Sequence, residues 1–314
     1  MNEVKTYQKT DKGEVKKLLS IIWRKRFIYC LLLPATVLVI IFSYLPIGGL
    51  KMAFQEYNIY NPSASTWTGL ENFKEILKMK DGISSIFTTL KISLLSMGIC
   101  FPLTIVFALM LNEIRNAYFK KVIQTVSYLP HFLSWISVIG IVATLYSSNG
   151  IINDVLAAII GSSYERKNLM ALREFFIPDV IILSTWKTLG WNSIVFLAAL
   201  TGIDQSLYEA AELDGAGKFK QVWHISIPGI LPTIVIMFLW RVAALFGDDF
   251  ELIFGLQNPF VNIETIGTVI YKNGIAGGNY QVSTAFGLMQ GLVNITFLLI
   301  VNMLSKKVTE VGLF

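Results

Sequence analysis

The sequence predicts an all-α membrane protein with six transmembrane helices, and three observations lead to this fold class. Of the 314 residues, 54% are apolar and 15% are charged, whereas soluble domains carry about 25% charged residues. The mean hydropathy is +0.59. Six stretches reach the roughly 20 mostly apolar residues that a spanning helix needs, and none alternates as the strands of a membrane β-barrel do. The predicted spans are 27–49, 87–111, 122–146, 177–202, 229–247 and 281–304.

The distribution of lysine and arginine predicts the orientation of these spans. With the N-terminus inside, the inner segments carry 15 basic side chains in 72 residues and the outer segments carry 8 in 100. Basic residues concentrate in cytoplasmic loops, so both termini are predicted to be cytoplasmic. This bias also explains the net charge of +5, and no nucleic-acid partner is implied. The inner segments are 1–26, 112–121, 203–228 and 305–314, and the outer segments are 50–86, 147–176 and 248–280.

One membrane domain, residues 27–304, is expected between two short cytoplasmic tails, 1–26 and 305–314. The N-terminal tail combines apolar residues with a basic flank, which fits either an interfacial helix or a solvated basic tail. The first span is too long for a signal peptide and lacks a small-residue cleavage pattern, so we expect it to be retained. Cys30 and Cys100 lie in predicted spans, where a thiol packs as an apolar side chain. We therefore predict no disulfide and no metal site.

The inner segment 203–228 is a polar stretch between two apolar spans. Ser206 followed three residues later by Glu209 matches a capping box, which predicts that a short helix begins at this point. Gly215 predicts the end of that helix, because glycine readily adopts the positive φ of a helix C-terminus. Pro228 then fits the first turn of the fifth span. A second helical turn or two is predicted for Lys218 to Ile225, so the segment is predicted to form a helix–turn–helix element between the fourth and fifth spans.

The same segment carries a family resemblance. Glu209-Ala-Ala, Gly215 and Ile225-x-Ile227-Pro228 resemble the EAA loop of permease subunits in binding-protein-dependent ABC importers. That loop has the form EAA, three residues, G, nine residues and I-x-L-P, so Ile227 replaces the usual leucine. The longer run Tyr-Glu-Ala-Ala-Glu-Leu-Asp-Gly-Ala-Gly is similar to the carbohydrate branch, and within it to permeases that import oligosaccharides or polysaccharide fragments. Weaker similarities elsewhere in the chain extend the resemblance to most residues from about 27 to 304.

The resemblance implies the type I ABC importer permease fold in a bacterial plasma membrane. It also implies that the EAA loop forms a coupling helix on a separate ATP-binding subunit. The implied coupling residues are Glu209, Ala210, Ala211, Asp214 and Gly215. The implied partners are a second homologous permease, two ATP-binding subunits, an extracytoplasmic solute-binding protein, membrane lipid and an oligosaccharide substrate. ATP and Mg²⁺ would bind the partner ATPase, and no cofactor is expected in this chain.

The chain itself is not expected to be an enzyme. Around Gly217-Lys218, a phosphate-binding loop would need glycine where Glu212 stands and Ser or Thr where Phe219 stands. The two histidines, His131 and His224, belong to no metal-binding or nucleophile–base pattern. ATP hydrolysis is therefore expected in another subunit.

Polar and aromatic residues inside the spans are candidates for a substrate pathway, because ionisable side chains there usually face a cavity or a partner. Aromatic faces stack on sugar rings, and amides or charges bind hydroxyl groups. Interhelical hydrogen bonds, interfacial tryptophan anchors and an Arg241–carboxylate pair are the alternative, structural interpretations of these residues. The candidates are Trp186, Lys187, Trp191, Asn192, Arg241, Gln290 and Asn294.

A stand-alone secondary carrier is the alternative function, because Lys187 and Arg241 would then bind a coupling ion or an anionic solute. Such a carrier would normally show an internal repeat or more spans, and neither is present in the sequence.

Overall fold

The computed structural model describes residues 20–21, 23–161, 163–309 and 312. Its residues form two units, Met1–Met52 and Ala53–Phe314, each described here by itself. Within the described residues, six helical runs are long and apolar enough to cross a membrane, which confirms the predicted number. These runs are Arg26–Phe54, Lys80–Glu113, Trp135–Ile160, Arg173–Thr201, Lys218–Ala243 and Tyr280–Lys307.

The first unit holds the first run. It consists of α2 (Arg26–Val39), a π-helical turn η1 (Ile40–Tyr44) and the 3-10 segment η2 (Leu45–Phe54), whose last two residues belong to the second unit. The N-terminal tail 1–26, for which an interfacial helix and a solvated tail were the two interpretations, is described only at residues 20–21 and 23–26.

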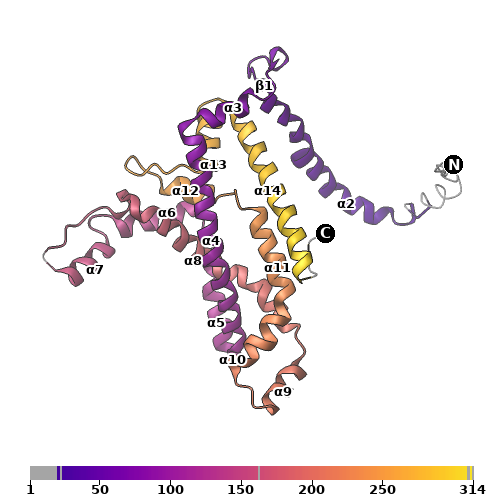
Figure 1. The fold of residues 1–314 in the computed structure, drawn as a ribbon, viewed down its shortest axis with the longest axis vertical. Coiled ribbons are helices and arrows are strands. Elements are labelled where there is room, and N and C mark those ends of the chain that lie inside the picture. Colours follow the sequence, from indigo (N-terminus) through magenta and orange to yellow (C-terminus); the bar gives the residue numbers. More distant parts are fainter. Residues whose placement is uncertain (1–19, 22, 162, 310–311, 313–314) are drawn as a thin grey trace. The chain divides into compact units, whose positions relative to one another are not determined.

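One end of the second unit carries the two strands assigned among the described residues, which form a short hairpin (Figure 1). Strands β1 (Gln55–Glu56) and β2 (Thr66–Trp67) pair antiparallel, with η3 (Pro62–Ala64) between them. Asn72, in α3 (Glu71–Lys78), donates through Nδ2 to the carbonyls of Ala53 and Gln55 at 2.9 and 3.0 Å. These two bonds attach α3 to the start of the hairpin.

Four long helices form the body of the second unit (Figure 1). They are α4 (Lys80–Glu113), α8 (Arg173–Thr201), α11 (Ile227–Ala243) and α14 (Tyr280–Thr309). Helix α4 packs along α8, and α11 packs against both α8 and α14. Apolar side chains fill the contacts in three clusters, because facing stripes of these helices carry Leu, Ile, Val and Phe. The body therefore buries side chains between helices and leaves many apolar ones outward, as lipid contact requires.

The predicted third span, 122–146, is wrong as a single helix. The chain forms α5 (Ala117–Tyr128), the 3-10 turn η4 (Leu129–Phe132) and then α6 (Trp135–Tyr146). Pro130 lacks the N–H that a helix needs and its ring clashes with the preceding turn. Ser134 then starts a new helix, because its Oγ accepts from the N–H of Ser137 at 3.2 Å. The membrane-length run combines α6 with α7 (Ile151–Ile160).

The fifth membrane-length run begins at Lys218 and not at residue 229, because the helical turns predicted for 218–225 continue without a break into the span. It passes through α10 (Lys218–Gln221) and the π-helical η6 (Val222–Ser226) into α11. Pro228 therefore lies inside a continuous run. The wider π turn directly before it gives room to the proline ring, which clashes with the preceding turn of an ordinary α-helix.

The predicted outer segment 248–280 is mostly helical. It contains α12 (Phe250–Leu256), α13 (Ile266–Ile270) and the π-helical η7 (Tyr271–Ala276). Helix α12 packs against α6, and α13 packs against α4 and α14. The segment 147–176 contains α7 and a short 3-10 turn η5 (Leu169–Ala171). The segment 248–280 therefore folds onto the helical body, whereas α7 packs against α6 and extends away from the body (Figure 1).

Candidate functional site

The inner segment forms α9 (Gln205–Leu213), which begins earlier than the predicted capping box. Asp204 is the N-cap, and its Oδ1 accepts from the N–H of Ser206 at 2.9 Å. This bond to the charged form lowers the pKa of the exposed Asp204 carboxyl. The predicted Ser206–Glu209 box is therefore wrong as the helix start, because an aspartate two residues earlier supplies the capping oxygen.

The predicted end of α9 is confirmed. Gly215 has φ of 74°, and two backbone bonds close the last turn. The N–H of Gly215 donates to the carbonyl of Glu212 at 3.1 Å, and the N–H of Ala216 donates to that of Ala211 at 2.8 Å. This is the Schellman arrangement, in which a left-handed residue reverses the chain after a helix.

Two side-chain links hold α9 against the start of the following run. The hydroxyls of Tyr208 and Ser226 lie 2.9 Å apart. Lys218 donates to Glu212 at 3.2 Å and to Gln221 at 3.0 Å. The Lys218 contact lowers the pKa of the exposed Glu212 carboxyl. Helix α9 is therefore tied to the helical run that continues into α11.

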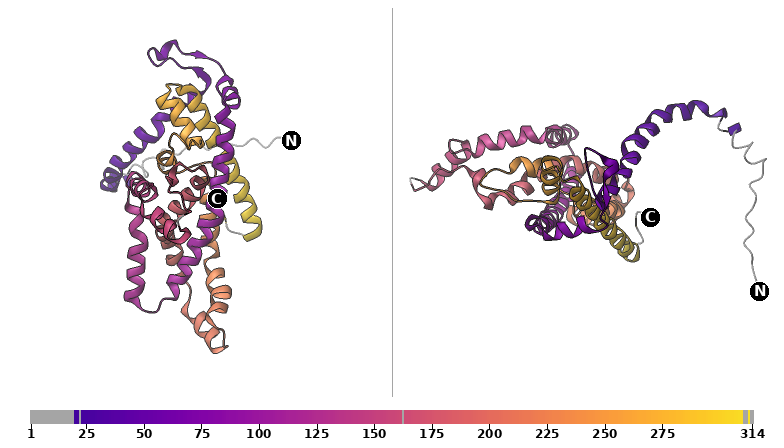
Figure 2. Two further views of the ribbon diagram at one scale, coloured as in Figure 1. Left: turned by 90° about the vertical axis from the view of Figure 1, so that its left-hand side faces the viewer. Right: turned by 90° about the horizontal axis from the view of Figure 1, so that it is seen from above.

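Helix α9 has no buried residue. Of the five predicted coupling residues, Ala211 is half-buried and the other four are exposed. Leu213 and Phe219 are 90% and 81% exposed. In Figures 1 and 2, α9 lies at the same end of the second unit as the α4–α5 connection. These two segments enclose a cavity of about 230 Å³, lined by Asn112, Glu113, Ile114, Arg115, Gln205, Tyr208, Glu209, Glu212 and Lys218.

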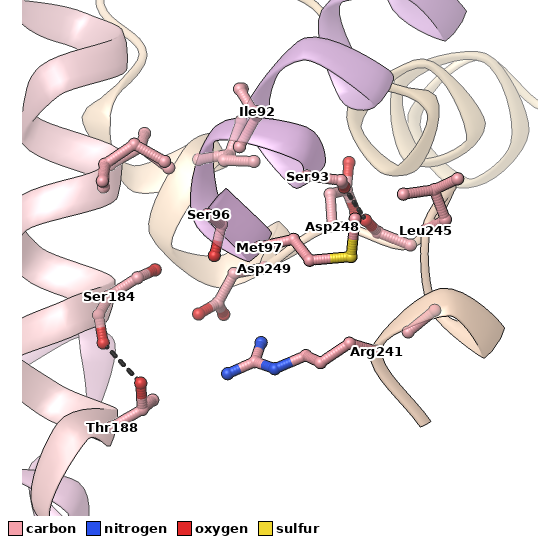
Figure 3. A pocket seen from close by; sticks show the side chains of 15 residues that line it. Ile92, Ser93, Ser96, Met97, Ser184, Thr188, Arg241, Leu245, Asp248 and Asp249 are labelled. Carbon is pink, nitrogen blue, oxygen red and sulfur yellow. Dashed lines mark hydrogen bonds between the residues drawn. The ribbon is translucent and has the colours of Figure 1, made fainter. Parts of the chain in front are cut away.

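A second cavity, of about 310 Å³, lies inside the body between α4, α8, α11 and α12. Figure 3 shows Arg241 of α11 extending into it, with Ser184 and Thr188 of α8 on one side and Asp249 above the guanidinium. Of the seven predicted pathway residues, only Arg241 lines this cavity. Its lining is Ile92, Ser93, Ser96, Met97, Val180, Ile181, Ser184, Thr188, Arg241, Ala244, Leu245, Gly247, Asp248, Asp249 and Ile253.

The charges in this cavity are not paired with one another. Among the described residues, no carboxylate oxygen lies within 4.0 Å of the Arg241 guanidinium. Asp248 instead accepts from the N–H of Gly267 at 3.0 Å. Burial raises the pKa of the Asp248 and Asp249 carboxyls.

The predicted aromatic and charged residues of α8 lie near each other but outside this cavity. The Lys187 ammonium sits 4.1 Å from the centre of the Trp135 ring, a cation–π contact. Trp191 stacks on His131 with ring centres 4.4 Å apart and planes 2° from parallel. Trp186 is 47% exposed, and Asn192 is half-buried. The structure therefore brings this part of α8 against the α5–α6 connection.

The two predicted amides of α14 bind the backbone at the end of α11. Gln290 donates to the carbonyl of Phe246 at 2.6 Å, and Asn294 accepts from the N–H of Phe246 at 3.0 Å. Phe246 lies three residues after Ala243, the last residue of α11, in the stretch where backbone groups lose their helical partners. Both amides thus complete the hydrogen bonding of a helix end, and neither lines the cavity.

We expect Asn294→Leu to destabilise the protein, because the Phe246 N–H would lose its acceptor. A buried donor left unsatisfied costs about 1–3 kcal/mol. The measurement is the midpoint of thermal unfolding in detergent. Leu292→Ala, at a position of α14 that is 56% exposed, serves as the control and should change the midpoint little. Equal midpoints for the two variants would contradict the role of Asn294.

Several cavity residues were absent from the sequence-based candidates. The hydroxyl residues of α4 and α8 carried no distinguishing signal, because Ser and Thr are common packing residues in membrane helices. The adjacent acids Asp248 and Asp249 were the available signal, since two carboxylates at the end of an apolar span are unusual. The added residues are Ser93, Ser96, Ser184, Thr188, Asp248 and Asp249.

Comparison with known proteins places these features in a family. Residues 100–310 match the family described as binding-protein-dependent transport system inner membrane component. Protein LplB of Bacillus subtilis (strain 168) is 35% identical, over 93% of this chain and 92% of its own. The polygalacturonan/rhamnogalacturonan transport system permease protein YteP of the same strain is 34% identical, over 96% and 95%.

A solved structure agrees with these relatives. A chain of the bacterial alginate ABC transporter, crystallised in complex with alginate pentasaccharide-bound periplasmic protein, superposes with a TM-score of 0.85 and 34% identity. The match covers 95% of this chain and 100% of that chain. The predicted type I ABC permease fold is thereby confirmed. The chain belongs to the family of binding-protein-dependent transport system inner membrane components.

Proposed function

We propose that this chain is a membrane-spanning permease subunit of an ATP-driven carbohydrate importer, and that its substrate is an oligosaccharide. One observation carries the proposal: α9 is an exposed helix with an ordered start and end, attached to a membrane-crossing run. A transport subunit that lacks a nucleotide site needs such a surface to receive force from an ATPase. The saccharides named for YteP and for the alginate transporter support the substrate class.

In this proposal, α9 is the coupling helix. Glu209, Ala210, Ala211, Asp214 and Gly215 would meet an ATP-binding subunit that holds ATP and Mg²⁺. The small alanines permit close approach, and the exposed Glu209 and Asp214 carboxylates suit basic groups on the partner. Exposed Leu213 and Phe219 add apolar area to the same surface.

The chain would build half of the translocation pathway, opposite a second homologous permease. Arg241 lines its cavity, and Trp186, Lys187, Trp191 and Asn192 remain proposed pathway residues on α8. Gln290 and Asn294 would act through the α11 end that they hold. Both tails, 1–26 and 305–314, are proposed to be cytoplasmic around the membrane domain 27–304. The outer segments 50–86 and 248–280 would meet an extracytoplasmic solute-binding protein.

The test is uptake in proteoliposomes that contain this chain with its partner permease and ATP-binding subunits. We expect labelled oligosaccharide to accumulate only with Mg-ATP on the cytoplasmic side and with solute-binding protein on the other. Collapsing ion gradients with ionophores should leave the rate unchanged. A secondary carrier would give the opposite result, with uptake that follows an ion gradient and ignores ATP, and that result would reject the proposal.

A further inference from the structure

We infer that α7 is an interfacial helix, whose apolar face lies in the lipid of the outer membrane surface. In this arrangement α7 does not cross the membrane, and α5 and α6 make the third crossing. The outer side rests on the proposed orientation, which places segment 147–176 outside. The contact with lipid is inferred from the helix itself.

One face of α7 is apolar and exposed. Ile151, Val155 and Ile159 recur every four residues, so they share one face of the helix, and all three are exposed, Ile159 to 76%. Helix α6, against which α7 packs, also exposes Ile141. Protein-binding surfaces obtain most of their energy from Trp, Tyr and Arg, whereas the three residues of this face are aliphatic. The face therefore suits acyl chains better than a protein partner.

The chain that follows α7 satisfies the polar groups of the helix. Asn153 is fully buried. Its Nδ2 donates to the carbonyl of Lys167 at 2.9 Å, and its Oδ1 accepts from the hydroxyl of Tyr164 at 2.8 Å. Asp154 pairs with Arg166 at 2.8 Å, and both side chains are exposed. The segment thus forms a complete fold of its own with a charged pair beside an apolar face, as an interfacial helix has.

A close turn separates α7 from α6. Gly150 is the N-cap of α7, and a Cβ there would lie 2.2 Å from the carbonyl oxygen of Leu145 and 2.6 Å from that of Thr144. The N–H of Gly150 donates to the carbonyl of Ser147 at 2.8 Å, which closes the turn. Figure 1 shows α7 extending away from the helical body.

The lengths of the helices agree with this arrangement. Helix α7 has 10 residues, whereas a crossing needs roughly 20. The preceding elements α5, η4 and α6 cover 117–146, which is enough to cross without α7. The third crossing can therefore end at α6, and α7 can lie along the membrane surface.

A second side of α7 offers further apolar surface. Leu156 and Ile160 of α7 line a cavity of about 400 Å³ together with Leu172 and Phe175 at the start of α8. Acyl chains fill such apolar space in a membrane. Lipid therefore has two places of contact on the same helix.

The experiment measures which side of α7 touches lipid in the complete complex, with the partner permease and the ATP-binding subunits in nanodiscs. The two native cysteines, Cys30 and Cys100, are replaced by serine. A single cysteine is then introduced as Ile159→Cys or Val155→Cys on the apolar face, or as Asp154→Cys on the polar side, and labelled with a fluorophore. Phosphatidylcholine with brominated acyl chains quenches a fluorophore that it contacts.

Quenching should be roughly twofold or more stronger at positions 155 and 159 than at 154. The apolar face of an interfacial helix lies about 5–10 Å inside the headgroup boundary, and the opposite face lies about one helix diameter farther out. Bromine near the headgroup should quench more than bromine near the chain end. In intact cells, a thiol reagent that cannot cross the membrane should react with Asp154→Cys from outside.

Three results would overturn the inference. Equal and weak quenching at all three positions would show that protein or water covers α7. Equal and strong quenching, greatest with bromine near the chain end, would make α7 part of a crossing helix. Reaction of Asp154→Cys only after the cells are permeabilised would contradict the outer side. Val155→Cys reports on the same face if Ile159→Cys fails to fold. None of these measurements needs ATP or sugar, so absence of ATP-driven carbohydrate uptake would reject the proposed function alone.

Discussion

Gly215→Ala is expected to lower oligosaccharide uptake far more than ATP hydrolysis in the reconstituted complex. Gly215 has φ of 74° at the end of α9, where a side chain costs about 1–2 kcal/mol. That strain reduces the population of the correct turn about 5–30-fold. Helix α9 would then point in a different direction relative to the ATP-binding subunit. ATP hydrolysis by that subunit would no longer move the membrane-spanning helices. The measured quantity is the number of sugar molecules taken up for each ATP hydrolysed.

Gly217→Ala is the matched control for this prediction. Gly217 has φ of −68°, and a Cβ there would meet nothing within 4 Å. Its uptake ratio should therefore equal that of the wild type. Gly215→Asn should recover part of the ratio, because asparagine tolerates the left-handed conformation. If Gly215→Ala also keeps the wild-type ratio, the turn after α9 plays no part in coupling.

Gly190→Ala is expected to prevent correct packing of α5 on α8. A Cβ at Gly190 would lie 2.2 Å from the carbonyl oxygen of Ser127 and 2.5 Å from its carbon. Both atoms belong to the backbone, so no side-chain rotation relieves the clash. Overpacking of this kind costs about 1–3 kcal/mol or more. We expect a lower yield of monodisperse complex and a lower midpoint of thermal unfolding in detergent.

Gly98→Ala provides the comparison inside another membrane helix. A Cβ at Gly98, in α4, would meet nothing within 4 Å. Alanine is favoured over glycine in a helix interior by roughly 0.5–1 kcal/mol, so this variant should be as stable as the wild type or slightly more so. Equal yield and stability of the two variants would show that α5 and α8 do not approach this closely.

The number of spans could be predicted from the sequence, whereas several of their ends could not. Hydropathy is a property of each residue by itself, so an apolar stretch that can lie in lipid is recognisable from the sequence. The break at Pro130 lay inside an apolar run and depended on Ser134 to start the next helix. The polar residues Lys218–Gln221 form the predicted helical turn, but hydropathy did not indicate that this turn continues into the fifth span. Helix ends depend on hydrogen bonds, which average hydropathy does not report.

The end of α9 could also be predicted, because its signals are local. A glycine with positive φ and an exposed EAA sequence act within a few residues of each other. The set of residues that line the cavity could not be predicted in this way. Arg241 was a candidate because an intramembrane charge is unusual, but its neighbours come from α4, α8 and α12. Gln290 and Asn294 were equally plausible candidates, and the structure uses them to bind the backbone of Phe246.

The sequence by itself determined the number of membrane-crossing runs, the family and the turn that ends α9. Each follows from composition or from contacts between residues close in the chain. Only the tertiary structure decided which polar side chains share a cavity, which complete a helix end and which charge is left without a partner. Those outcomes depend on how four helices rotate and pack against one another. Packing between distant segments therefore places Arg241 in the cavity and the other candidate pathway residues outside it. The sequence alone does not distinguish among these candidates.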